Sequence, residues 1–379
     1  MTLVAYTAEQ IFNGNALLSE HCLLVEDGHI LGLETVSKLP NSVEIIDLGA
    51  GVISQGFTDL QVNGGGGVMF NDDPSVATLS TMARAHGLLG STSILPTLIT
   101  DTPQVTRAAI DAVDQAIAQG IDGIAGLHLE GPHLDPRRAG AHLPKFIRPM
   151  EQDDLALLLE AAKRLPVLKV TIAPSAVTLD QISDLAQAGV LVSLGHSECT
   201  AQEALAARDA GASCVTHLFN AMSQLTPREP GLVGAALTQT GLMTGLIADL
   251  IHIHPDSLRA ALSAKPRGSS FLVSDAMAVA GSDLDCFTLN GRKITRRDGR
   301  LTLEDGTLAG ADLELSRAIA NLVSLGITPE DTLAMATTIP SRMIGLDVGL
   351  TQAGPADFVH LGPDWQLSQV WRRGEALLR

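Results

Sequence analysis

The central part of the chain alternates short apolar runs with longer amphipathic stretches. From residue 54 to about residue 276, β-rich runs are separated by segments whose apolar residues return at helical spacing. This alternation is typical of a parallel sheet whose strands are joined by crossover helices. The strand candidates number eight and are, in chain order, GFTDLQVN, TSILPTLIT, GIAGLHLEG, VLKVTIAP, VLVSLGHS, SCVTHLFN, MTGLIADL and SFLVSDAM. Eight such units predict an α/β fold, a (β/α)₈ TIM-like barrel.

One connecting segment illustrates the helical pattern. In TPQVTRAAIDAVDQAIAQG, residues 102–120, the apolar residues Val105, Ile110 and Ile117 recur at near-helical spacing, and Gly120 ends the segment. Glycine is common directly after a helix because it adopts a left-handed backbone conformation without strain. We therefore predict an amphipathic helix that ends before Gly120.

The pattern changes to strand alternation at both ends of the chain. HCLLVEDGHILGLE, residues 21–34, predicts a hairpin with an Asp-Gly turn at 27–28, and VEIIDLGAGVIS, residues 43–54, predicts a second strand pair. The C-terminal ADFVHLGPDWQLSQVWRRGEALL has the same alternation. Two strand-rich ends that flank one barrel predict a small β-sandwich domain built from both termini.

These patterns define the expected domain organisation. We place the N-terminal part of the small domain at residues 1–53, the barrel at residues 54–340 and the C-terminal part of the small domain at residues 341–379. Residues 286–310 carry Asn-Gly and Asp-Gly turns, which predict a β-hairpin insert at about 283–310, after the eighth barrel strand.

Composition and charge narrow the range of partners. The 379 residues are 45% hydrophobic, which is ample for a large core and one smaller appendage. The formal net charge of −17 would repel a polyphosphate backbone, and no cluster of Lys and Arg interrupts it, so we expect no nucleic acid partner. A small anion can still bind where a few Arg, His and backbone N–H groups converge.

The sequence also indicates a compartment. It contains no uninterrupted apolar stretch of 18 residues, and its first residues lack a basic region followed by a long apolar run. We therefore expect a cytoplasmic protein that does not bind a membrane. The four cysteines, Cys22, Cys199, Cys214 and Cys286, are sparse for a disulfide scaffold, and we expect reduced thiols.

Polar residues at the ends of the predicted strands are the candidates for chemistry, because active sites of (β/α)₈ barrels lie at the C-terminal ends of the strands. Strand three ends in Glu130, strand five in His196 and strand six in His217. A carboxylate and two imidazoles that converge there would hold zinc or a similar divalent ion and leave one position open. Each residue alone is more simply a hydrogen-bonded polar side chain, but three at equivalent depth favour a metal site.

A rival zinc site uses the cysteines. His196-x₂-Cys199 and Cys214-x₂-His217 resemble a closed structural site of two Cys and two His. Strand alternation argues against it, because Cys214 faces the outer helices if His217 points into the barrel.

Two further residues are candidates for proton transfer and carbonyl activation. Asp275 ends strand eight and can act as a general base that later returns the proton to a leaving amine. A divalent ion assists such a base by lowering the pKa of bound water towards about 7. His142, in the loop after strand three, can polarise a carbonyl group. In a purely structural role, Asp275 would cap a strand end and His142 would be an ordinary loop histidine.

Anion recognition has its own candidates. Asn220 and Ala221 follow strand six, and backbone N–H groups in this loop can bind a phosphate. Arg228 can add two charge-assisted hydrogen bonds to a phosphate, although it is equally consistent with a surface ion pair. His252 follows Asp249 at the end of strand seven and is a further candidate.

Gln61 and Asn63 lie at the end of strand one, in GFTDLQVNGGGG at residues 56–67. The four glycines are not a phosphate-binding loop, because neither a Lys-Ser/Thr pair nor a third spaced glycine follows them. The two amides instead stand where another kind of enzyme would keep metal ligands.

Seven stretches together resemble the N-acetylglucosamine-6-phosphate deacetylases of the amidohydrolase superfamily. They are GLHLEGPHL, GAHLPKFIR, VSLGHS, THLFNAM, REPGLVGAAL, LVSDAMAVAG and DGTLAG. The resemblance runs in order through nearly the whole chain. It implies hydrolysis of the acetamide of N-acetyl-D-glucosamine 6-phosphate to D-glucosamine 6-phosphate and acetate, in amino-sugar catabolism. The alternative is the same chemistry on N-acetyl-D-galactosamine 6-phosphate.

The resemblance also implies roles for individual residues. Glu130, His196 and His217 match the ligands of one divalent ion per subunit, Zn²⁺ in the first place and Fe²⁺ as the alternative. Asp275 matches the catalytic carboxylate, and His142 matches a position that contacts the sugar phosphate, from which we expect it to stabilise the oxyanion. Substrate contacts are implied for Gln61, Asn220, Ala221, Arg228 and His252. In the family, the arginine can reach the site of a neighbouring subunit, which implies a homodimer.

The amides on strand one have a counterpart in the family. Many amidohydrolases carry His-x-His there and hold two metals, whereas Gln61-Val62-Asn63 resembles members that use one. Two departures are Ser175, where relatives commonly have glutamate, and His133, where an aromatic residue is frequent. Ser175 puts local hydrogen bonding or substrate shape in question, but not the chemistry.

Two other classes remain as alternatives. A two-metal cyclic amidase is disfavoured by Gln61 and Asn63 and by the lack of an obvious bridging lysine on strand four. A non-catalytic sugar-phosphate sensor is disfavoured because the metal ligands and Asp275 are all retained.

Overall fold

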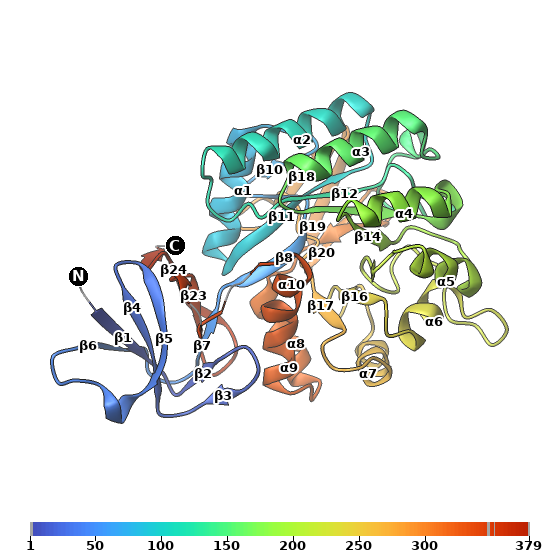
Figure 1. Ribbon diagram of the computed structural model, residues 1–379. Coiled ribbons are helices and arrows are strands. Elements are labelled where there is room, and N and C mark those ends of the chain that lie inside the picture. Colours follow the sequence, from blue (N-terminus) through green and yellow to red (C-terminus); the bar gives the residue numbers. More distant parts are fainter. Residues whose placement is uncertain (1–2, 347–348, 352, 378–379) are drawn as a thin grey trace.

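The computed structural model describes residues 3–346, 349–351 and 353–377, and its largest part is a barrel of eight parallel strands (Figure 1). The strands are β8 (Phe57–Val62), β11 (Ser91–Ile99), β12 (Leu127–Glu130), β13 (Leu168–Ile172), β14 (Leu191–Leu194), β15 (Cys214–Val215), β16 (Met243–Leu246) and β17 (Ser270–Leu272). Each pairs with the next in parallel. All eight predicted strands form, which confirms the (β/α)₈ fold.

The barrel closes between its first and last strands. The backbone N–H of Asp275 donates to the carbonyl of Gln61 at 3.1 Å, and Val62 and Ala276 form a parallel bridge. The buried carboxylate of Asp59 accepts hydrogen bonds from the backbone N–H groups of Gln61 and Ser274, at 3.1 and 3.2 Å. The seam therefore lies directly beside the candidate residues at the ends of strands one and eight.

Helices cover the outside of the barrel (Figure 1). They are α1 (Val76–Leu88), α2 (Pro103–Ala118), α3 (Gln152–Arg164), α4 (Leu179–Gln187), α5 (Ala201–Asp209), α6 (Gly231–Thr238), α7 (Pro255–Ala264), α8 (Leu315–Ser324), α9 (Pro329–Ala336) and α10 (Thr338–Met343). Short 3₁₀ turns occur at Val36–Lys38, Pro136–Arg138, Pro144–Phe146 and Pro174–Ala176. Among the described residues, no helix is both long enough and apolar enough to cross a membrane.

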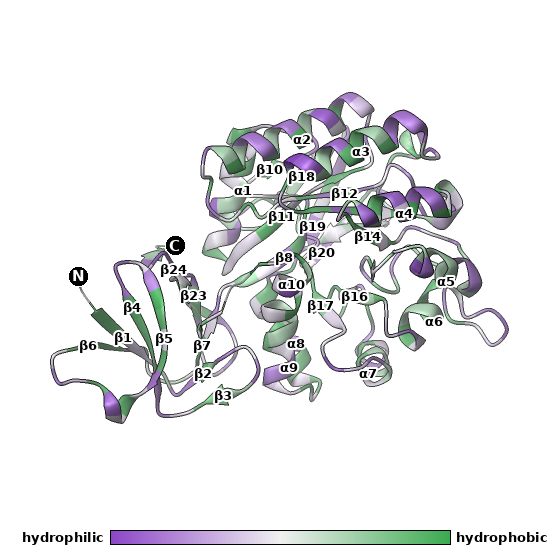
Figure 2. Cartoon of the chain, viewed as in Figure 1, coloured by the Kyte–Doolittle hydropathy of each residue, from purple (hydrophilic) through white to green (hydrophobic). Residues whose placement is uncertain are grey.

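The helix predicted from residues 102–120 forms as expected. Thr102 caps the N-terminus of α2 by accepting from the N–H of Val105, and Gly120 takes a φ of 71° just beyond the C-terminal end. Its face towards the barrel, which includes Ile110 and Val113, is buried. Figure 2 shows hydrophilic and hydrophobic residues mixed along α2 and α3, as expected for helices with one buried face.

The small domain is built from both ends of the chain, which confirms that part of the predicted fold. One sheet has the order β22-β5-β4-β1-β6 and the other β25-β24-β23-β7-β2-β3. Their strands are β1 (Leu3–Thr7), β2 (Gln10–Phe12), β3 (Leu17–Leu18), β4 (His21–Glu26), β5 (His29–Thr35), β6 (Glu44–Asp47), β7 (Val52–Gln55), β22 (Gly354–Pro355), β23 (Phe358–Leu361), β24 (Leu367–Arg372) and β25 (Glu375–Leu377). Tyr6, Phe358 and Trp371 pack in its core, with ring centroids 4.5 to 5.5 Å apart.

Details of the small domain differ from the predicted pairing. The hairpin of β4 and β5 turns at Asp27 and Gly28, both with positive φ, as an Asp-Gly turn requires. Residues 43–54 do contain two strands, but the expectation that they form a pair is wrong. β6 pairs with β1 in one sheet and β7 pairs with β2 and β23 in the other, because the intervening Gly49 and Gly51 let the chain cross between sheets.

The boundaries of the small domain and the barrel at residues 53/54 and 340/341 remain a prediction. Residues 1–2, 347–348, 352 and 378–379, which fall in the two predicted parts of the small domain, lie outside the described residues. The segment predicted as a hairpin insert forms four antiparallel strands, β18 (Cys286–Leu289), β19 (Arg292–Arg297), β20 (Arg300–Thr302) and β21 (Leu308–Ala311). Its buried Leu289 and Ile294 pack with Met277, just beyond strand eight. The insert thus lies beside the mouth of the barrel.

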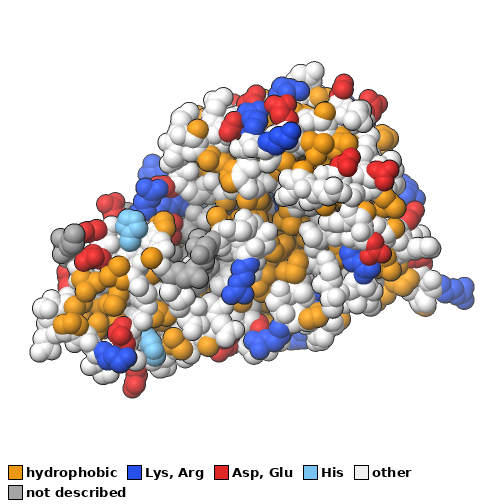
Figure 3. All heavy atoms as spheres, viewed as in Figure 1, with side chains coloured by type: hydrophobic (Ala, Val, Ile, Leu, Met, Phe, Trp, Pro, Cys, Tyr) orange, Lys and Arg blue, Asp and Glu red, His pale blue; other side chains and the backbone are white. Residues whose placement is uncertain are grey.

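Charged side chains are dispersed over the surface. On the face shown in Figure 3, Lys and Arg lie interspersed with Asp and Glu, and no continuous basic area is visible there. The four cysteines are free thiols, three of them buried, in agreement with the expected reduced state.

Candidate active site

A cavity of about 370 Å³ opens at the C-terminal ends of the barrel strands. Glu130 comes from the end of β12, and the other polar groups come from loops that follow the strands and from the insert. The cavity is lined by, among others, Asn63, Glu130, His142, His196, His217, Asn220, Ala221, His252, Asp275 and Thr307. The structure therefore brings together residues that lie up to 247 positions apart, from Asn63 to Gly310.

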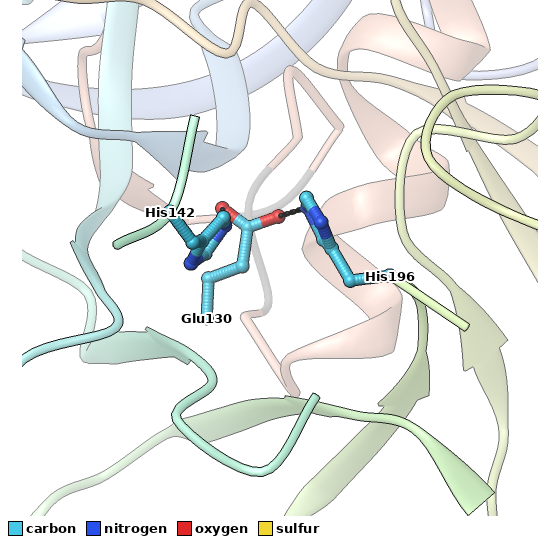
Figure 4. Close-up of side chains that lie close together, drawn as sticks. All are labelled: Glu130, His142 and His196. Atoms are coloured by element: carbon cyan, nitrogen blue, oxygen red, sulfur yellow. Dashed lines mark hydrogen bonds and ion pairs between the residues drawn. The ribbon is translucent and has the colours of Figure 1, made fainter. Parts of the chain in front are cut away.

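Three predicted metal ligands converge on one point. Nε2 of His196 and Nε2 of His217 lie 3.2 and 3.0 Å from Oε1 of Glu130, and 3.1 Å from each other. Tetrahedral zinc with bonds of about 2.0 to 2.2 Å spaces its ligands by roughly 3.3 to 3.6 Å, close to these values. Figure 4 shows the Glu130 carboxylate between the rings of His142 and His196.

The hydrogen bonds of His196 show that this donor set fits a cation. Its Nδ1 lies 2.8 Å from the carbonyl of Arg138, which can only accept, so Nδ1 carries the proton. In the neutral ring, Nε2 then directs a lone pair at the Glu130 oxygen, which also carries lone pairs. A divalent ion between them would turn this repulsion into coordination. The three residues therefore fit one metal ion.

The pKa values follow from burial and this proximity. Burial opposes ionisation of Glu130, but His196 and His217, which donate to the carboxylate when Nε2 is protonated, outweigh it and hold the pKa of Glu130 well below its usual range. Burial likewise opposes protonation of His217, and the hydrogen bond with Glu130 raises the pKa of His217. Glu130 thus stays an anion in a closed environment.

His142 lies on the other side of Glu130. Its Nε2 is 4.0 Å from Oε2 of Glu130, and Glu130, His142 and His196 offer ligand atoms within 4.8 Å of one another. We assign His217 rather than His142 to the metal set, because Nε2 of His217 is 1.0 Å closer to the carboxylate. Burial, with His196 nearby, lowers the pKa of His142 to about 3, so the ring is neutral.

Gln61 and Asn63 donate hydrogen bonds to the buried carboxylates of the site. Nδ2 of Asn63 donates to Oδ1 of Asp275 at 2.7 Å, and Nε2 of Gln61 donates to the same oxygen at 3.0 Å. Nε2 of Gln61 also lies 3.3 Å from both oxygens of Glu130. Burial, and then the charge of Glu130, raise the pKa of Asp275, whereas the hydrogen bond from Asn63 lowers it. The amides therefore act as donors, not as ligands.

Three residues of the site have a strained backbone conformation. His196, His217 and Asp275 have φ values of 44°, 29° and 50°, in the left-handed region that side chains rarely adopt. Ala221 in the predicted anion loop has a φ of 49°. Such conformations cost of order 1–3 kcal/mol each and persist where the surroundings demand them, typically at functional sites.

The glycine run packs tightly beside the cavity. A side chain at Gly64 would come within 2.5 Å of the carbonyl of Val68 and 2.8 Å of the backbone N of Ala278. The N–H groups of Gly66 and Gly67 donate to the carbonyls of Ala280 and Ala278, at 2.7 and 2.9 Å. The glycines thus let the short strands β9 (Gly64–Gly65) and β10 (Val68–Met69) lie against the segment that follows Asp275.

The predicted substrate-binding residues are only partly gathered. Asn220, Ala221 and His252 line the cavity, whereas Gln61 and Arg228 are not among its described lining residues. Nδ1 of His252 lies 2.6 Å from Oδ2 of Asp249. Burial alone would raise the pKa of Asp249, but the interaction with His252 outweighs it and lowers this pKa. Arg228 is exposed on the loop before α6. The substrate roles of all these residues remain predictions.

The structural zinc alternative finds no support in the geometry. The argument from strand alternation is wrong for Cys214, which pairs in register with Ser193, as Ser193 does with Thr171, and so faces the barrel interior, because the strand ends at Val215, before His217. Its Sγ lies 3.8 Å from the carbonyl of Val192. Burial raises the pKa of Cys199 to about 11, so its thiol stays protonated. Strand four does carry a lysine, Lys169, but its Nζ lies near the carbonyl of Leu60 and over the ring of Phe271.

Sequence reasoning missed the residues that surround the ligands. Arg137 and Arg138 line the cavity, and so do Thr307 and Leu308 of the insert. The side chain of Arg138 pairs with Glu198 while its carbonyl holds His196. The available signals were the position of PRRAG between two predicted site residues and the stretch DGTLAG, which contains Thr307 and Leu308. The contacts themselves join distant segments.

Known proteins resemble the chain in sequence and in structure. The sequence profile described as Amidohydrolase family matches residues 52–377. The chain is 40% identical to the N-acetylgalactosamine-6-phosphate deacetylase of Shewanella sp. (strain ANA-3), over 99% of this chain and 96% of the relative. It is 33% identical to the N-acetylglucosamine-6-phosphate deacetylase of Haemophilus influenzae, over 94% of each chain. The crystal structure of N-acetylglucosamine-6-phosphate deacetylase from Pasteurella multocida matches with a TM-score of 0.94 and 33% identity, with both chains covered completely.

Proposed function

The chain belongs to the amidohydrolase family, and from this premise we propose that it hydrolyses the acetamide of an N-acetylated hexosamine 6-phosphate to the amino-sugar phosphate and acetate. One observation carries the proposal. The cavity holds three converging ligand atoms, from Glu130, His196 and His217, beside the buried carboxylate of Asp275. Such a donor set and base suit the metal-assisted hydrolysis of an amide.

The metal requirement follows from the donor set. We propose one divalent ion per subunit, held by Glu130, His196 and His217, with Zn²⁺ as the first candidate and Fe²⁺ as the alternative. When bound, such an ion supplies Lewis acidity and lowers the pKa of water. Gln61 and Asn63 place N–H donors where a second ion would need acceptors, which supports a single ion.

Asp275 moves the protons in this proposal. As a carboxylate it takes a proton from the attacking water, and it then returns this proton to the amine that leaves. The hydrogen bonds from Gln61 and Asn63 both reach Oδ1, which leaves Oδ2 free of these donors for the reaction. The same bonds fix the carboxylate against the seam of the barrel.

His142 stabilises the developing oxyanion. Its ring is neutral at neutral pH because burial lowers its pKa to about 3, so a proton on Nε2 can be donated without leaving an isolated charge. This nitrogen faces the cavity near Glu130. His142 would thus polarise the acetyl carbonyl from the side opposite the metal set.

The phosphate site is proposed from the loops. Asn220, Ala221 and His252 lie together in the cavity wall and can contact the substrate. Arg228 is exposed and is not part of the described lining of its own cavity, which supports the proposal that it serves the site of a second copy in a homodimer. We expect this homodimer to act in the cytoplasm, in amino-sugar catabolism.

The substrate epimer has two candidates. N-acetyl-D-glucosamine 6-phosphate, predicted from the sequence motifs, is favoured by the relatives from Haemophilus influenzae and Pasteurella multocida. N-acetyl-D-galactosamine 6-phosphate is favoured by the relative with 40% identity, the highest of the three.

One experiment tests the proposal. Acetate release is measured from both phosphorylated epimers and from unphosphorylated N-acetylglucosamine, with metal analysis of the same sample. We expect turnover of at least one phosphorylated sugar, a much lower kcat/KM without phosphate, and one ion per chain. Binding without acetate release would contradict the proposal and indicate a sensor, and two ions per chain would indicate a two-metal amidase.

A further inference from the structure

Thr100 contacts His142 with two groups at once. It follows the last residue of β11 and is buried. Its Oγ1 lies 2.7 Å from Nδ1 of His142, and its backbone N–H points at the same nitrogen from 3.3 Å. Neither group contacts Nε2, the ring nitrogen that faces Glu130 and the cavity.

These contacts determine which ring nitrogen carries the proton. A backbone N–H can only donate, so Nδ1 of His142 must offer a lone pair to it. The hydroxyl of Thr100 has a second neighbour, the carbonyl of Glu130, but at 3.4 Å this contact is much longer than the 2.7 Å to Nδ1. With two donors on Nδ1, the single proton of the neutral ring lies on Nε2.

The position of this proton matters for the reaction. An Nε2–H group can donate to a carbonyl oxygen that gains negative charge, whereas the other tautomer would present a lone pair to it. Removal of the hydroxyl leaves one longer contact on Nδ1 and lets the tautomers mix. The loop that carries His142 has a contact that does not involve Thr100, because the guanidinium of Arg292 donates to the carbonyl of the neighbouring Ala141.

We propose that Thr100 is a positioning residue that keeps His142 in the Nε2–H tautomer for donation to the substrate carbonyl. This inference rests on the proposed function for its catalytic consequence, but the tautomer can be measured without activity. Loss of the partner on the far side of a metal-binding histidine typically costs about 10- to 100-fold in affinity or activity, and we expect a loss of the same order for His142.

Kinetics test the consequence in the protein loaded with Zn²⁺. We expect Thr100→Ala to lower kcat about 10- to 100-fold with KM within about threefold, and Thr100→Ser to stay within about threefold of the wild type. A matched control is Thr244→Val, which removes a buried hydroxyl whose oxygen lies 2.8 Å from Ser270 Oγ but does not contact His142. A similar kcat loss in Thr244→Val, or no rescue by serine, would overturn the proposal.

A double variant tests whether Thr100 acts through His142. In a His142→Asn background the ring is gone, so Thr100→Ala should cause no further loss of kcat. An independent, multiplied loss would show that Thr100 acts by another route and would overturn the proposal.

Nitrogen-15 NMR of the histidine rings separates this inference from the proposed function. In the wild type, Nδ1 of His142, assigned by comparison with His142→Asn, should have the shift of an unprotonated nitrogen, and Thr100→Ala should move it towards the mixed value. A protonated Nδ1 in the wild type would overturn the inference. If no sugar phosphate is hydrolysed, the proposed function fails, while the shifts still decide the role of Thr100.

Discussion

The two halves of the site differ in what they direct at its centre. Glu130, His196 and His217 converge with acceptor atoms, 3.0 to 3.2 Å apart. Gln61 and Asn63, on the other side, present N–H donors that lie 2.7 to 3.0 Å from Asp275. Acceptors that crowd together need a cation, whereas neutral amides that donate to a carboxylate are satisfied without one. The comparison supports the proposal that one side of the barrel binds the ion, while the other positions Asp275 as the base.

Loss of a ligand from the acceptor half should have the largest effect. His217→Ala leaves Glu130 and His196 as the only members of the set, and two protein ligands hold zinc poorly. We expect ion content to fall well below one per chain and acetate release to drop by more than about 10³-fold. The measurement is metal analysis with turnover on the same sample. His29→Ala, an exposed histidine of the small domain, is the control and should keep both.

Loss of the base should separate turnover from ion binding. Asp275→Asn keeps the shape and an oxygen that can accept from Asn63, but it cannot take a proton. We expect turnover to fall by roughly 10² to 10⁴ fold while the ion content stays that of the wild type. Steady-state kinetics with metal analysis checks this. Normal turnover would remove Asp275 from the mechanism, and loss of the ion would place it in the acceptor half.

Loss of the Asn63 side chain, a donor of the amide half, should change how activity depends on pH. The hydrogen bond from Asn63 lowers the pKa of Asp275, so Asn63→Ala should raise that pKa further. The base works when ionised, so the acid limb of kcat/KM against pH should move to higher pH. Activity should fall about tenfold on that limb and recover as pH rises. An unchanged acid limb, or a lost ion, would contradict the division between the halves.

The fold was predictable because its signals are local. Each strand of the barrel is a short apolar run, and the helix that ends before Gly120 shows its period and its stop within 19 residues. The pairing of residues 43–54 was not predictable, because β6 pairs with β1 and β7 pairs with β2 and β23, and a local pattern does not contain these contacts. Likewise, the insert gained two strands beyond the expected hairpin.

The site was predictable where residues stand at strand ends. Glu130, His196 and His217 could be named because parallel strands bring their C-terminal ends to one face. The role of Gln61 as a donor to two carboxylates, and the contact of Thr100 with His142, depend on side chains from different strands. Spacing along the chain does not encode such contacts, so these roles needed coordinates.

The smallest effect is expected outside both halves, at Ser175. The side chain of Ser175 is exposed, and its hydroxyl makes only a long contact of 3.5 Å with Oδ2 of Asp135. The carboxylate of Asp135 is already paired with Arg137, and the backbone N–H of Asp135 donates to the carbonyl of His196. Ser175→Ala should therefore change the free energy of unfolding by no more than about 0.5 kcal/mol and leave the ion content unchanged. Chemical denaturation and kinetics on both epimers check this, with Ser183→Ala, at a half-buried serine of α4, as the control. A shift of the epimer preference by more than about threefold would show that this position, where relatives commonly have glutamate, influences substrate shape and not only the support of the acceptor half.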